Sequence, residues 1–344
     1  MKDVAELAGV SVATVSYALN EPDRVASATL ERVKVAIEHL GFRRNRNARS
    51  LAHGDPRLVG FVMIELRNSL FVDIATGAQA AASDAGLRLQ LASSDNDTAQ
   101  QDEHTDFFDE MRATGILIAP MTDPRQTVER MRRHRRPIVV LNYDMRDVDT
   151  CTVLVDNERV GYLAARHLID LGRTRLAYVA GRDHLQPVSL RRAGIRRAVD
   201  EEAGRVTLEE ISTEAVGERD GAIAGEHLLE RAPKDRPDGV IAVTDLIAVA
   251  LTSVLGTAGV SVPDEIAVMW CDYNSTAWSG SVPLTSVALH GEEMGRAAIR
   301  LLLDEARNGP RHVHTTVMVQ PELIPRASTV GIAGETSARR SAPS

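Results

Sequence analysis

The N-terminal region begins with Lys2-Asp3-Val4-Ala5-Glu6-Leu7-Ala8-Gly9-Val10-Ser11-Val12-Ala13-Thr14-Val15-Ser16-Tyr17-Ala18-Leu19-Asn20, and this stretch contains two short segments with helical periodicity. The apolar residues at helical spacing are Val4, Leu7 and Ala8 in the first segment and Val15, Ala18 and Leu19 in the second. Gly9 is suited to end the first helix, and Ser11 is a good N-cap for the second. A short turn that contains a glycine joins two helices at a steep angle, so the stretch predicts a helix-turn-helix.

A third helix is expected directly after this pair, with Ser27 as its N-cap. Its expected buried residues are Leu30, Val33, Ile37 and Leu40. The first helix starts close to Met1, where Asp3 is a candidate cap and a chain start further upstream is the alternative. Three helices in this order are typical of units that place the exposed face of the second helix in the major groove of DNA.

The charge distribution supports this interpretation of the N-terminal region. The formal net charge of the 344-residue chain is −8, which by itself argues against a polyanionic partner. Residues 1–53, however, carry eight Lys and Arg against six Asp and Glu, so this region has a charge of +2 and the remainder has −10. Four of the eight bases fall within residues 43–49, where phosphates would be met. A run of charges is commonly only a solvated surface, but beside this helical pattern it favours DNA binding.

The same residues carry a family resemblance. The segments that carry it are Asp3-Val4-Ala5, Ala8-Gly9-Val10-Ser11, Thr14-Val15-Ser16 and Leu19-Asn20, followed by Glu31-Arg32-Val33, Leu40-Gly41-Phe42 and Ala48-Arg49-Ser50-Leu51. They resemble the start of LacI-type bacterial transcriptional regulators (LacI/GalR family), and the resemblance continues over nearly the whole chain. It implies a DNA-binding domain at residues 1–44, a hinge helix and linker at 45–56, and an effector-binding and dimerisation domain at 57–330.

After residue 56 the pattern changes to alternating strands and helices. Apolar runs typical of strands are Leu58–Ile64, Leu87–Ala92, Gly115–Ala119, Ile138–Leu141, Thr152–Val155, Leu176–Ala180, Gly239–Val243 and Ile266–Cys271. Helical patterns between them include Val72–Ala85, Val160–Leu171, Leu190–Glu202, Gly221–Arg231 and Ile247–Ala258. This alternation predicts an α/β fold with parallel, doubly wound sheets, and the strands are too many for one compact sheet. We therefore expect two α/β lobes, followed by a disordered tail at residues 331–344.

Ligands of such lobes bind beyond the carboxyl ends of the strands. Five of the twelve aromatic residues, Phe71, Tyr143, Trp270, Tyr273 and Trp278, are expected there, although core packing is the simpler explanation for each one alone. The resemblance implies a periplasmic-binding-protein-like sensor with its effector in the cleft between the lobes. The residues expected to bind the effector are Asn68, Phe71, Asp95, Asn142, Asp144, Arg191, Asp245 and Asp272. Acids, amides and an arginine beside aromatic walls favour a sugar, with a nucleoside or purine as the alternative.

The resemblance also assigns roles in DNA binding by position. Val12, Ala13 and Tyr17 are expected to touch base edges. The residues expected to contact phosphates are Thr14, Ser16, Asn20, Ser27, Thr29 and Asn45; for Thr14 and Ser16 a solvent-facing hydroxyl is the alternative. Ala48, Arg49 and Leu51 belong to the implied hinge helix, which enters the minor groove when two subunits pair. A homodimer on a near-palindromic double-stranded operator is therefore expected.

Other function classes find little support in the sequence. The phosphate-binding, nucleophile-elbow and Cys-x-x-Cys motifs of common enzymes are absent, so we expect neither catalysis nor a cofactor. His312 and His314 are expected in a strand without carboxylate partners, and no metal site is expected. With Cys151 and Cys271 as the only cysteines and neither a signal peptide nor a membrane span predicted, we expect a cytoplasmic protein. The alternative is a cytosolic small-molecule-binding protein or sugar enzyme of the same two-lobed fold that does not bind specific DNA.

Overall fold

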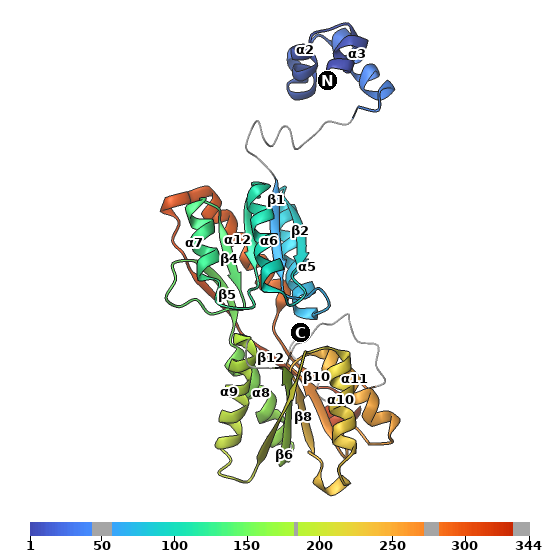
Figure 1. The fold of residues 1–344 in the computed structure, drawn as a ribbon, viewed down its shortest axis with the longest axis vertical. Coiled ribbons are helices and arrows are strands. Elements are labelled where there is room, and N and C mark those ends of the chain that lie inside the picture. Colours follow the sequence, from blue (N-terminus) through green and yellow to red (C-terminus); the bar gives the residue numbers. More distant parts are fainter. Residues whose placement is uncertain (43–56, 182–184, 272–281, 333–344) are drawn as a thin grey trace. The chain divides into compact units, whose positions relative to one another are not determined.

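The computed structural model describes residues 1–42, 57–181, 185–271 and 282–332. The chain divides into two compact units, residues 1–56 and 57–344 (Figure 1). The predicted hinge residues Asn45, Ala48, Arg49 and Leu51 lie outside the described residues, as do Asp272, Tyr273 and Trp278.

The N-terminal unit contains the three predicted helices. They are α1 (Lys2–Ala8), α2 (Val12–Asn20) and α3 (Ser27–His39), with a 3-10 turn η1 (Pro22–Arg24) between the last two. Gly9 has a φ of 61° and ends α1, because this left-handed conformation costs a glycine least. The Ser11 hydroxyl caps α2 by accepting a hydrogen bond from the Thr14 amide at 3.0 Å. The helices bury a small apolar core of Val4, Ala5, Ala8, Val15, Ala18, Val33 and Ala36.

Several details of this unit differ from the sequence-based expectations. Ser27 is the first residue of α3 rather than its cap; the cap position is Ala26, which offers no side-chain acceptor. Asp3 lies inside the first turn of α1 and does not cap it. Leu7 and Leu40 are 51% and 43% exposed, because the small residues Ala5 and Ala36 occupy the buried side of their helices instead.

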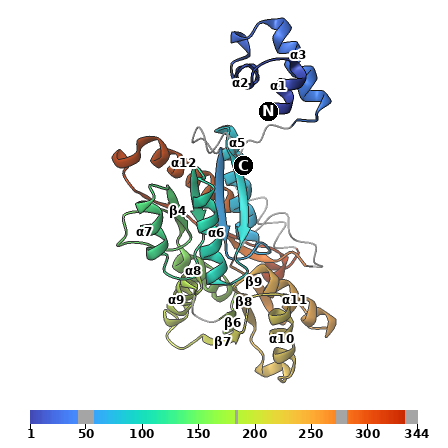
Figure 2. The same cartoon turned by 45° about the horizontal axis from the view of Figure 1, so that its top comes forward.

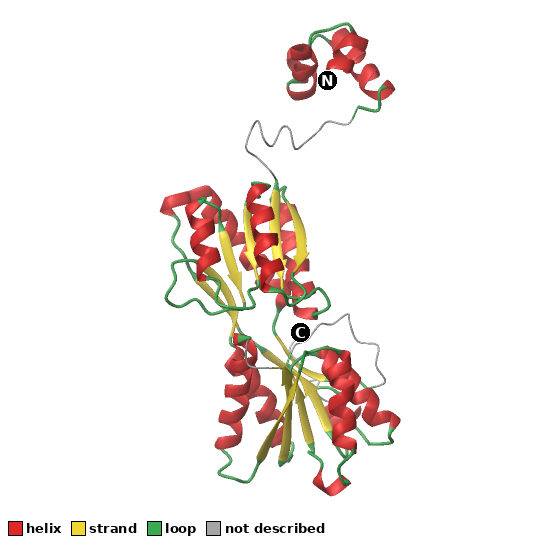
Figure 3. Ribbon diagram, in the orientation of Figure 1, coloured by secondary structure: helices red, strands yellow, loops and turns green. Residues whose placement is uncertain are grey.

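The described residues of the larger unit form two six-stranded sheets (Figures 1 and 3). The first sheet has the order β11-β5-β4-β3-β1-β2, with β1 (Leu58–Met63), β2 (Arg88–Ser93), β3 (Gly115–Ile118), β4 (Ile138–Leu141), β5 (Cys151–Val155) and β11 (Thr316–Val319). The second has the order β12-β10-β9-β8-β6-β7, with β6 (Arg175–Gly181), β7 (Thr207–Thr213), β8 (Gly239–Ala242), β9 (Ala267–Trp270), β10 (Thr285–Ala288) and β12 (Glu322–Ile324). All of these pairs are parallel except β10 with β12, so the predicted doubly wound architecture is confirmed.

Each sheet has its own helices, and together they form two lobes. The first lobe adds α5 (Ser69–Asp84), α6 (Thr98–Glu110), α7 (Arg125–Arg133) and α12 (Gly291–Asn308) to the first sheet. The second lobe adds α8 (Asn157–Asp170), α9 (Gln186–Asp200), α10 (Glu218–Leu229) and α11 (Asp245–Thr257) to the second sheet. The rotated view in Figure 2 shows the same grouping. In the described part of the chain, no helix has the length and apolar character needed to cross a bilayer.

Three helix pairs pack closely at glycines. A Cβ added to Gly77 or Gly295 would lie 2.0 or 2.1 Å from a backbone oxygen of the partner helix in the pair α5 and α12. The pair α8 and α9 meets in the same way at Gly161 and Gly194, and α10 meets α11 at Gly221. Any larger residue at these positions must push the two helices apart, so the glycines fix the distance between the helices of each lobe.

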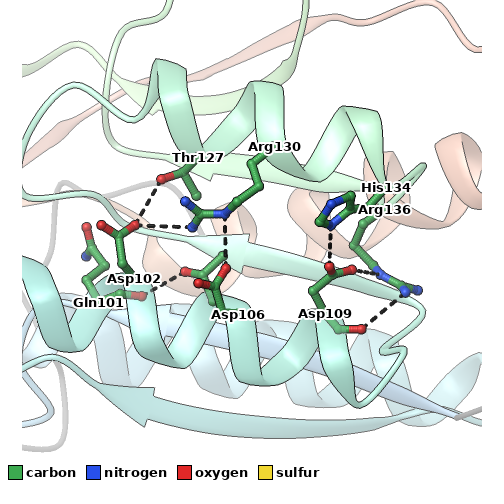
Figure 4. Close-up of polar contacts among 9 residues, drawn as sticks. Gln101, Asp102, Asp106, Asp109, Thr127, Arg130, His134 and Arg136 are labelled. Atoms are coloured by element: carbon green, nitrogen blue, oxygen red, sulfur yellow. Dashed lines mark hydrogen bonds and ion pairs between the residues drawn. The ribbon is translucent and has the colours of Figure 1, made fainter.

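The helices α6 and α7 are joined by ion pairs, which Figure 4 shows. Arg130 bonds Asp106 at 3.0 Å and Asp102 at 3.3 Å, and the Nε of Arg136 donates to Asp109 at 2.9 Å. Burial raises the pKa of Asp109, but hydrogen bonds from Arg136 and His134 outweigh it and lower that pKa below its usual range. These ion pairs of residues 130–136 hold α7 and the residues that follow it against α6.

The C-terminal end of the described chain also differs from expectation. Residues 331 and 332 were expected to begin a disordered tail, but they end a short helical segment that spans 327–332. Residues 333–344 lie outside the described residues.

Candidate nucleic-acid interface and ligand-binding residues

Helix α2 presents a surface that is available to a partner of the N-terminal unit. Val15 and Ala18 point into the small core, which leaves the opposite side of the helix facing solvent. On that side Val12 is 42% exposed and Tyr17 is 50% exposed, and Ala13 is exposed as well. The three residues expected to touch base edges thus share an accessible, largely apolar surface that carries one hydroxyl group.

A shallow hollow lies beside this surface. It is lined by Thr14, Tyr17, Arg24, Val25, Ala26 and Thr29, so it brings together three residues that the sequence assigned to DNA contacts. The sequence analysis did not assign Arg24 to DNA contacts, although Arg24 is the first cation after α2. Its side chain is 73% exposed and pairs with Glu21 at 2.8 Å. An exposed guanidinium beside hydroxyl groups is a suitable group for a phosphate.

The remaining predicted phosphate contacts lie on the same unit. Ser16 is half-buried in α2, Asn20 ends α2, and Ser27 is exposed at the start of α3. The hydroxyl groups of Thr14 and Ser11 lie 2.8 Å apart, so the Thr14 hydroxyl takes part in the cap of α2 rather than facing solvent alone.

In the larger unit, five of the predicted ligand-binding residues follow the carboxyl ends of strands, whereas Arg191 lies within α9. Asn68 comes after β1, Asp95 after β2, and Asn142 and Asp144 after β4, all in the first lobe. Asp245 follows β8 in the second lobe, where it is the first residue of α11. This is the edge of a parallel sheet at which ligands of doubly wound folds bind.

A buried chain of hydrogen bonds connects these residues across the lobes. Asn157, at the start of α8, donates from Nδ2 to the Oδ1 of Asn142 at 2.8 Å. Its own Oδ1 accepts from the Nε of Arg191 at 2.9 Å, and Nη1 of Arg191 donates to the Val243 carbonyl at 3.2 Å. All three side chains are at most 9% exposed. The end of β4 in the first lobe is thereby linked to the end of β8 in the second.

Two further contacts join the same parts of the lobes. The Asp144 amide donates to Oε1 of Gln186, the first residue of α9, at 2.6 Å. The Asp245 carboxylate interacts with the side chain of Ser69, at the start of α5. Burial raises the pKa of Asp245, and the interactions with Ser69 and the Leu246 amide offset only part of this rise. The facing strand-end loops are therefore held by hydrogen bonds that a polar ligand is able to replace.

Other predicted ligand residues do not join this network. Asp95 is exposed and accepts from the Ser93 hydroxyl at 2.7 Å. Phe71 lies in the first turn of α5 rather than at a strand end, and it is 5% exposed within the core. Trp270 ends β9 but is only 3% exposed, so both aromatic residues pack in the core. Asn68 is used locally, because its Oδ1 accepts from the Leu70 amide at 3.0 Å and caps α5.

Sequence reasoning missed three members of the network, Ser69, Asn157 and Gln186. Each is the first residue of a helix that follows a strand. Asn157, for example, lies two residues after the apolar run of β5. A search for polar side chains at the starts of helices, as well as at the ends of strands, would have found all three.

The chain is similar to known proteins over both units. Residues 1–45 match the profile described as bacterial regulatory proteins, lacI family, and residues 165–329 match a periplasmic binding protein-like domain. The HTH-type transcriptional repressor PurR of Vibrio campbellii (strain ATCC BAA-1116) is 30% identical over 327 residues, covering 95% of this chain and 97% of that protein. The HTH-type transcriptional regulator DegA of Bacillus subtilis (strain 168) is 28% identical over 333 residues, with 95% and 97% covered.

Solved structures give the same result for the fold. A complex of the transcriptional regulator CelR with cellobiose has 27% identity and a TM-score of 0.69, covering 95% of this chain and 98% of that one. The lac repressor dimer bound to operator and the anti-inducer ONPF has 21% identity and a TM-score of 0.79 over the same shares of the two chains.

Proposed function

Because the chain belongs to the lacI family of bacterial regulatory proteins, we propose that it is a sequence-specific DNA-binding repressor controlled by a small molecule. In this proposal the N-terminal unit binds an operator, and a ligand between the two lobes sets the affinity of that binding. The observation that carries the proposal is the combination, in one chain, of an exposed helix-turn-helix surface with a polar network at the strand ends of two lobes.

For DNA recognition, we assign base contacts to Val12, Ala13 and Tyr17. Val12 and Ala13 offer apolar contact, for example to a thymine methyl group, and Tyr17 adds a hydroxyl. The phosphate contacts assigned are Thr14, Ser16, Asn20, Arg24, Ser27, Thr29 and Asn45, of which Thr14, Arg24 and Thr29 line the hollow beside Tyr17. Ala48, Arg49 and Leu51 form the proposed minor-groove contact of the hinge.

We propose that the protein binds its operator as a homodimer, because one helix-turn-helix covers only half of a near-palindromic site. The similar lac repressor structure is a dimer bound to its operator, which supports this proposal. The curated relatives are transcriptional regulators, which supports a protein that is not an enzyme and that acts on DNA in the bacterial cytoplasm.

For the effector, we propose a sugar bound by Asn68, Asn142, Asp144, Arg191, Asp245 and Asp272, with Asp95 at the edge of the site and Phe71 in the core beneath it. Acids, amides and a guanidinium suit the hydroxyl groups of a sugar ring. The cellobiose complex of a 27% identical regulator supports this class. A nucleoside or purine is the alternative ligand.

The test is a selection of bound sequences from random DNA with the full-length protein, repeated in the presence of sugar and nucleoside panels. We expect a near-palindromic consensus whose enrichment changes with one member of the panels. The Tyr17→Ala variant should relax that consensus at one position in each half-site. Enrichment of no sequence, with ligand binding retained in calorimetry, would contradict the proposal and favour a plain binding protein of this fold.

A further inference from the structure

A second group of chemically reactive side chains lies in the first lobe, at the amino ends of its strands, whereas the residues assigned to the effector follow the carboxyl ends. Cys151 is the first residue of β5, and His312 and His314 lie in the segment that leads into β11. Since β5 and β11 are parallel neighbours, the two segments meet at the amino ends of both strands. One ligand atom from each of the three residues lies within 4.8 Å of the other two.

The orientation of His312 is fixed from both sides. Its Nε2 lies 3.1 Å from the Sγ of Cys151, and its Nδ1 lies 2.7 Å from the Oδ2 of Asp304 near the end of α12. The His312 side chain is only 2% exposed. A carboxylate bonded to one imidazole nitrogen, with the other nitrogen directed at a thiol, is the arrangement that orients histidines in metal sites. The sequence-based expectation that these histidines lie in a strand without a carboxylate partner is therefore wrong.

A hydrogen bond between thiol and imidazole explains the contact of Cys151 with His312, but it leaves His314 unexplained. The Nδ1 of His314 is buried and has no hydrogen-bond partner within the described residues. The same is true of the Oε2 of Glu305, whose carboxylate interacts electrostatically with both Cys151 and His312. Leaving buried polar atoms unpaired costs stability, so two of them beside a thiol and an imidazole indicate a missing partner.

We propose that Cys151, His312 and His314 bind a divalent transition-metal ion of the Zn²⁺ class. One sulfur and two imidazole nitrogens are ligands for a borderline-soft ion and unsuited to Mg²⁺ or Ca²⁺, which take oxygen ligands. On binding, the thiol of Cys151 releases its proton to solvent and coordinates as the thiolate, replacing its contact with His312. Glu305, whose carboxylate interacts electrostatically with Cys151 and His312, is the candidate for the fourth position, and water is the alternative occupant.

The geometry requires only a small adjustment. Two ligand atoms on a tetrahedral Zn²⁺ with bonds of about 2.0–2.3 Å lie roughly 3.3–3.8 Å apart. The three atoms here, with a closest described pair at 3.1 Å and none beyond 4.8 Å, reach that spacing by side-chain movements of about 1 Å. His314 is only partly buried, which gives an ion access from solvent.

Bound metal would fasten the segment before β11 to β5 and to the end of α12. After this segment the chain forms β11 in the first lobe and then crosses to β12 in the second lobe. We therefore expect the ion to raise the thermal stability of the protein, since an ion that binds only the folded state stabilises it by mass action.

The test uses the full-length protein, without an affinity tag and reduced, titrated with Co²⁺ and then with Zn²⁺. We expect a near-ultraviolet band of thiolate-to-cobalt charge transfer that saturates at a single ion per chain and disappears when Zn²⁺ displaces the cobalt. Zn²⁺ alone should raise the melting temperature. Absence of the band at a several-fold excess of Co²⁺ would overturn the proposal.

Matched variants separate coordination from general damage to the fold. Cys151→Ser and His314→Gln should both lose the band, whereas Cys271→Ser, at the other buried cysteine, and His134→Gln, at an exposed histidine of the same lobe, should keep it. Circular dichroism without metal shows whether each variant is folded. A folded Cys151→Ser variant that retains the band would contradict the assignment, and Glu305→Gln decides the fourth ligand by the change in cobalt affinity.

Discussion

Arg191 illustrates how one buried side chain supports the contact between the two lobes, because it holds Asn157, which in turn bonds Asn142 of the first lobe. Its guanidinium donates in two directions, to the Asn157 side chain and to the Val243 carbonyl, while it is only 5% exposed. A lysine keeps the charge but presents a single compact ammonium group, which cannot reproduce the planar fork. Arg191 is therefore both a link within the protein and the residue proposed to bind the effector bidentately.

We predict that Arg191→Lys weakens effector binding by about tenfold or more, because a bond to a charged group is worth about 1.5–3 kcal/mol. Isothermal titration calorimetry with the effector found by selection measures this change. Arg205→Lys is the control, since the Arg205 side chain is 76% exposed and pairs with Glu202, outside the proposed ligand site. Equal affinities of Arg191→Lys and the wild-type protein would remove Arg191 from the ligand site.

At Tyr17, the prediction concerns the choice of DNA sequence. Tyr17→Ala should cost about 1–3 kcal/mol of operator binding and relax the preference at one position in each half-site. The unfolding midpoint should hardly change, because Tyr17 is 50% exposed. Val35→Ala, an exposed position on α3, is the control in the same fluorescence anisotropy assay. A uniform loss on all DNA sequences would instead indicate a phosphate contact.

Among the structural elements, the close helix pairs make the sharpest demand on the sequence. A methyl group at Gly295 would lie 2.1 Å from the Ile74 carbonyl oxygen, whereas one at Gly256, within α11, would meet no atom within 4 Å. Both glycines lie in helices, so the comparison of the two positions isolates the effect of the space around the added methyl group.

We predict that Gly295→Ala lowers the free energy of unfolding by about 1–3 kcal/mol or more, because α5 and α12 must separate. Gly256→Ala should raise it by about 0.5–1 kcal/mol through helix propensity alone. Denaturant unfolding of both variants measures the difference. If both variants raised the free energy of unfolding, α5 and α12 would be able to separate at little cost, and the prediction would be wrong.

Asp73 of α5 lies near Glu292 of α12, and it should make the stability of the protein depend on pH. Burial and the nearby Glu292 raise the pKa of Asp73 from 3.8 to about 6. Since the folded state holds this proton more tightly than the unfolded state, the contribution of Asp73 to stability falls as the pH rises from about 4 to about 6.

Asp73→Asn should therefore stabilise the protein at pH 7 by about 1 kcal/mol, a value reduced from the full shift because the carboxyl is half-exposed and screened by solvent. At pH 4 the two proteins should have nearly equal stability, because Asp73 is then protonated in the folded state and partly so in the unfolded state. Thermal melts at both values measure the effect, and a constant difference would contradict it.

The elements also show what the sequence could predict. Continuous apolar runs identified the inner strands of the first sheet and β6, β8 and β9 of the second, because strands buried on two faces contain few polar residues. The inner strand β10 was missed, since Thr-Ser-Val-Ala is short and half polar. The edge strand β7 was missed, since Thr-Leu-Glu-Glu-Ile-Ser-Thr is half-exposed and lacks such a run. The histidines before β11 were misjudged because Cys151 lies 161 residues away in the chain, and no local pattern reports a contact of that range.

At the scale of the whole molecule, we propose that the strand-end network of the larger unit controls operator binding by the N-terminal unit. A ligand that replaces the bonds between Asn142, Asn157 and Arg191 changes how the two lobes are held together. Since the larger unit is proposed to dimerise, such a change alters the spacing of the two DNA-binding units. Coupling between two sites of this kind is typically about 1–3 kcal/mol.

The most direct test of this claim is the affinity of the full-length protein for its selected operator, measured by fluorescence anisotropy with and without a saturating effector. We predict a change of about 5–150-fold in the dissociation constant. An unchanged constant, while calorimetry on the same sample shows the effector bound, would contradict the account.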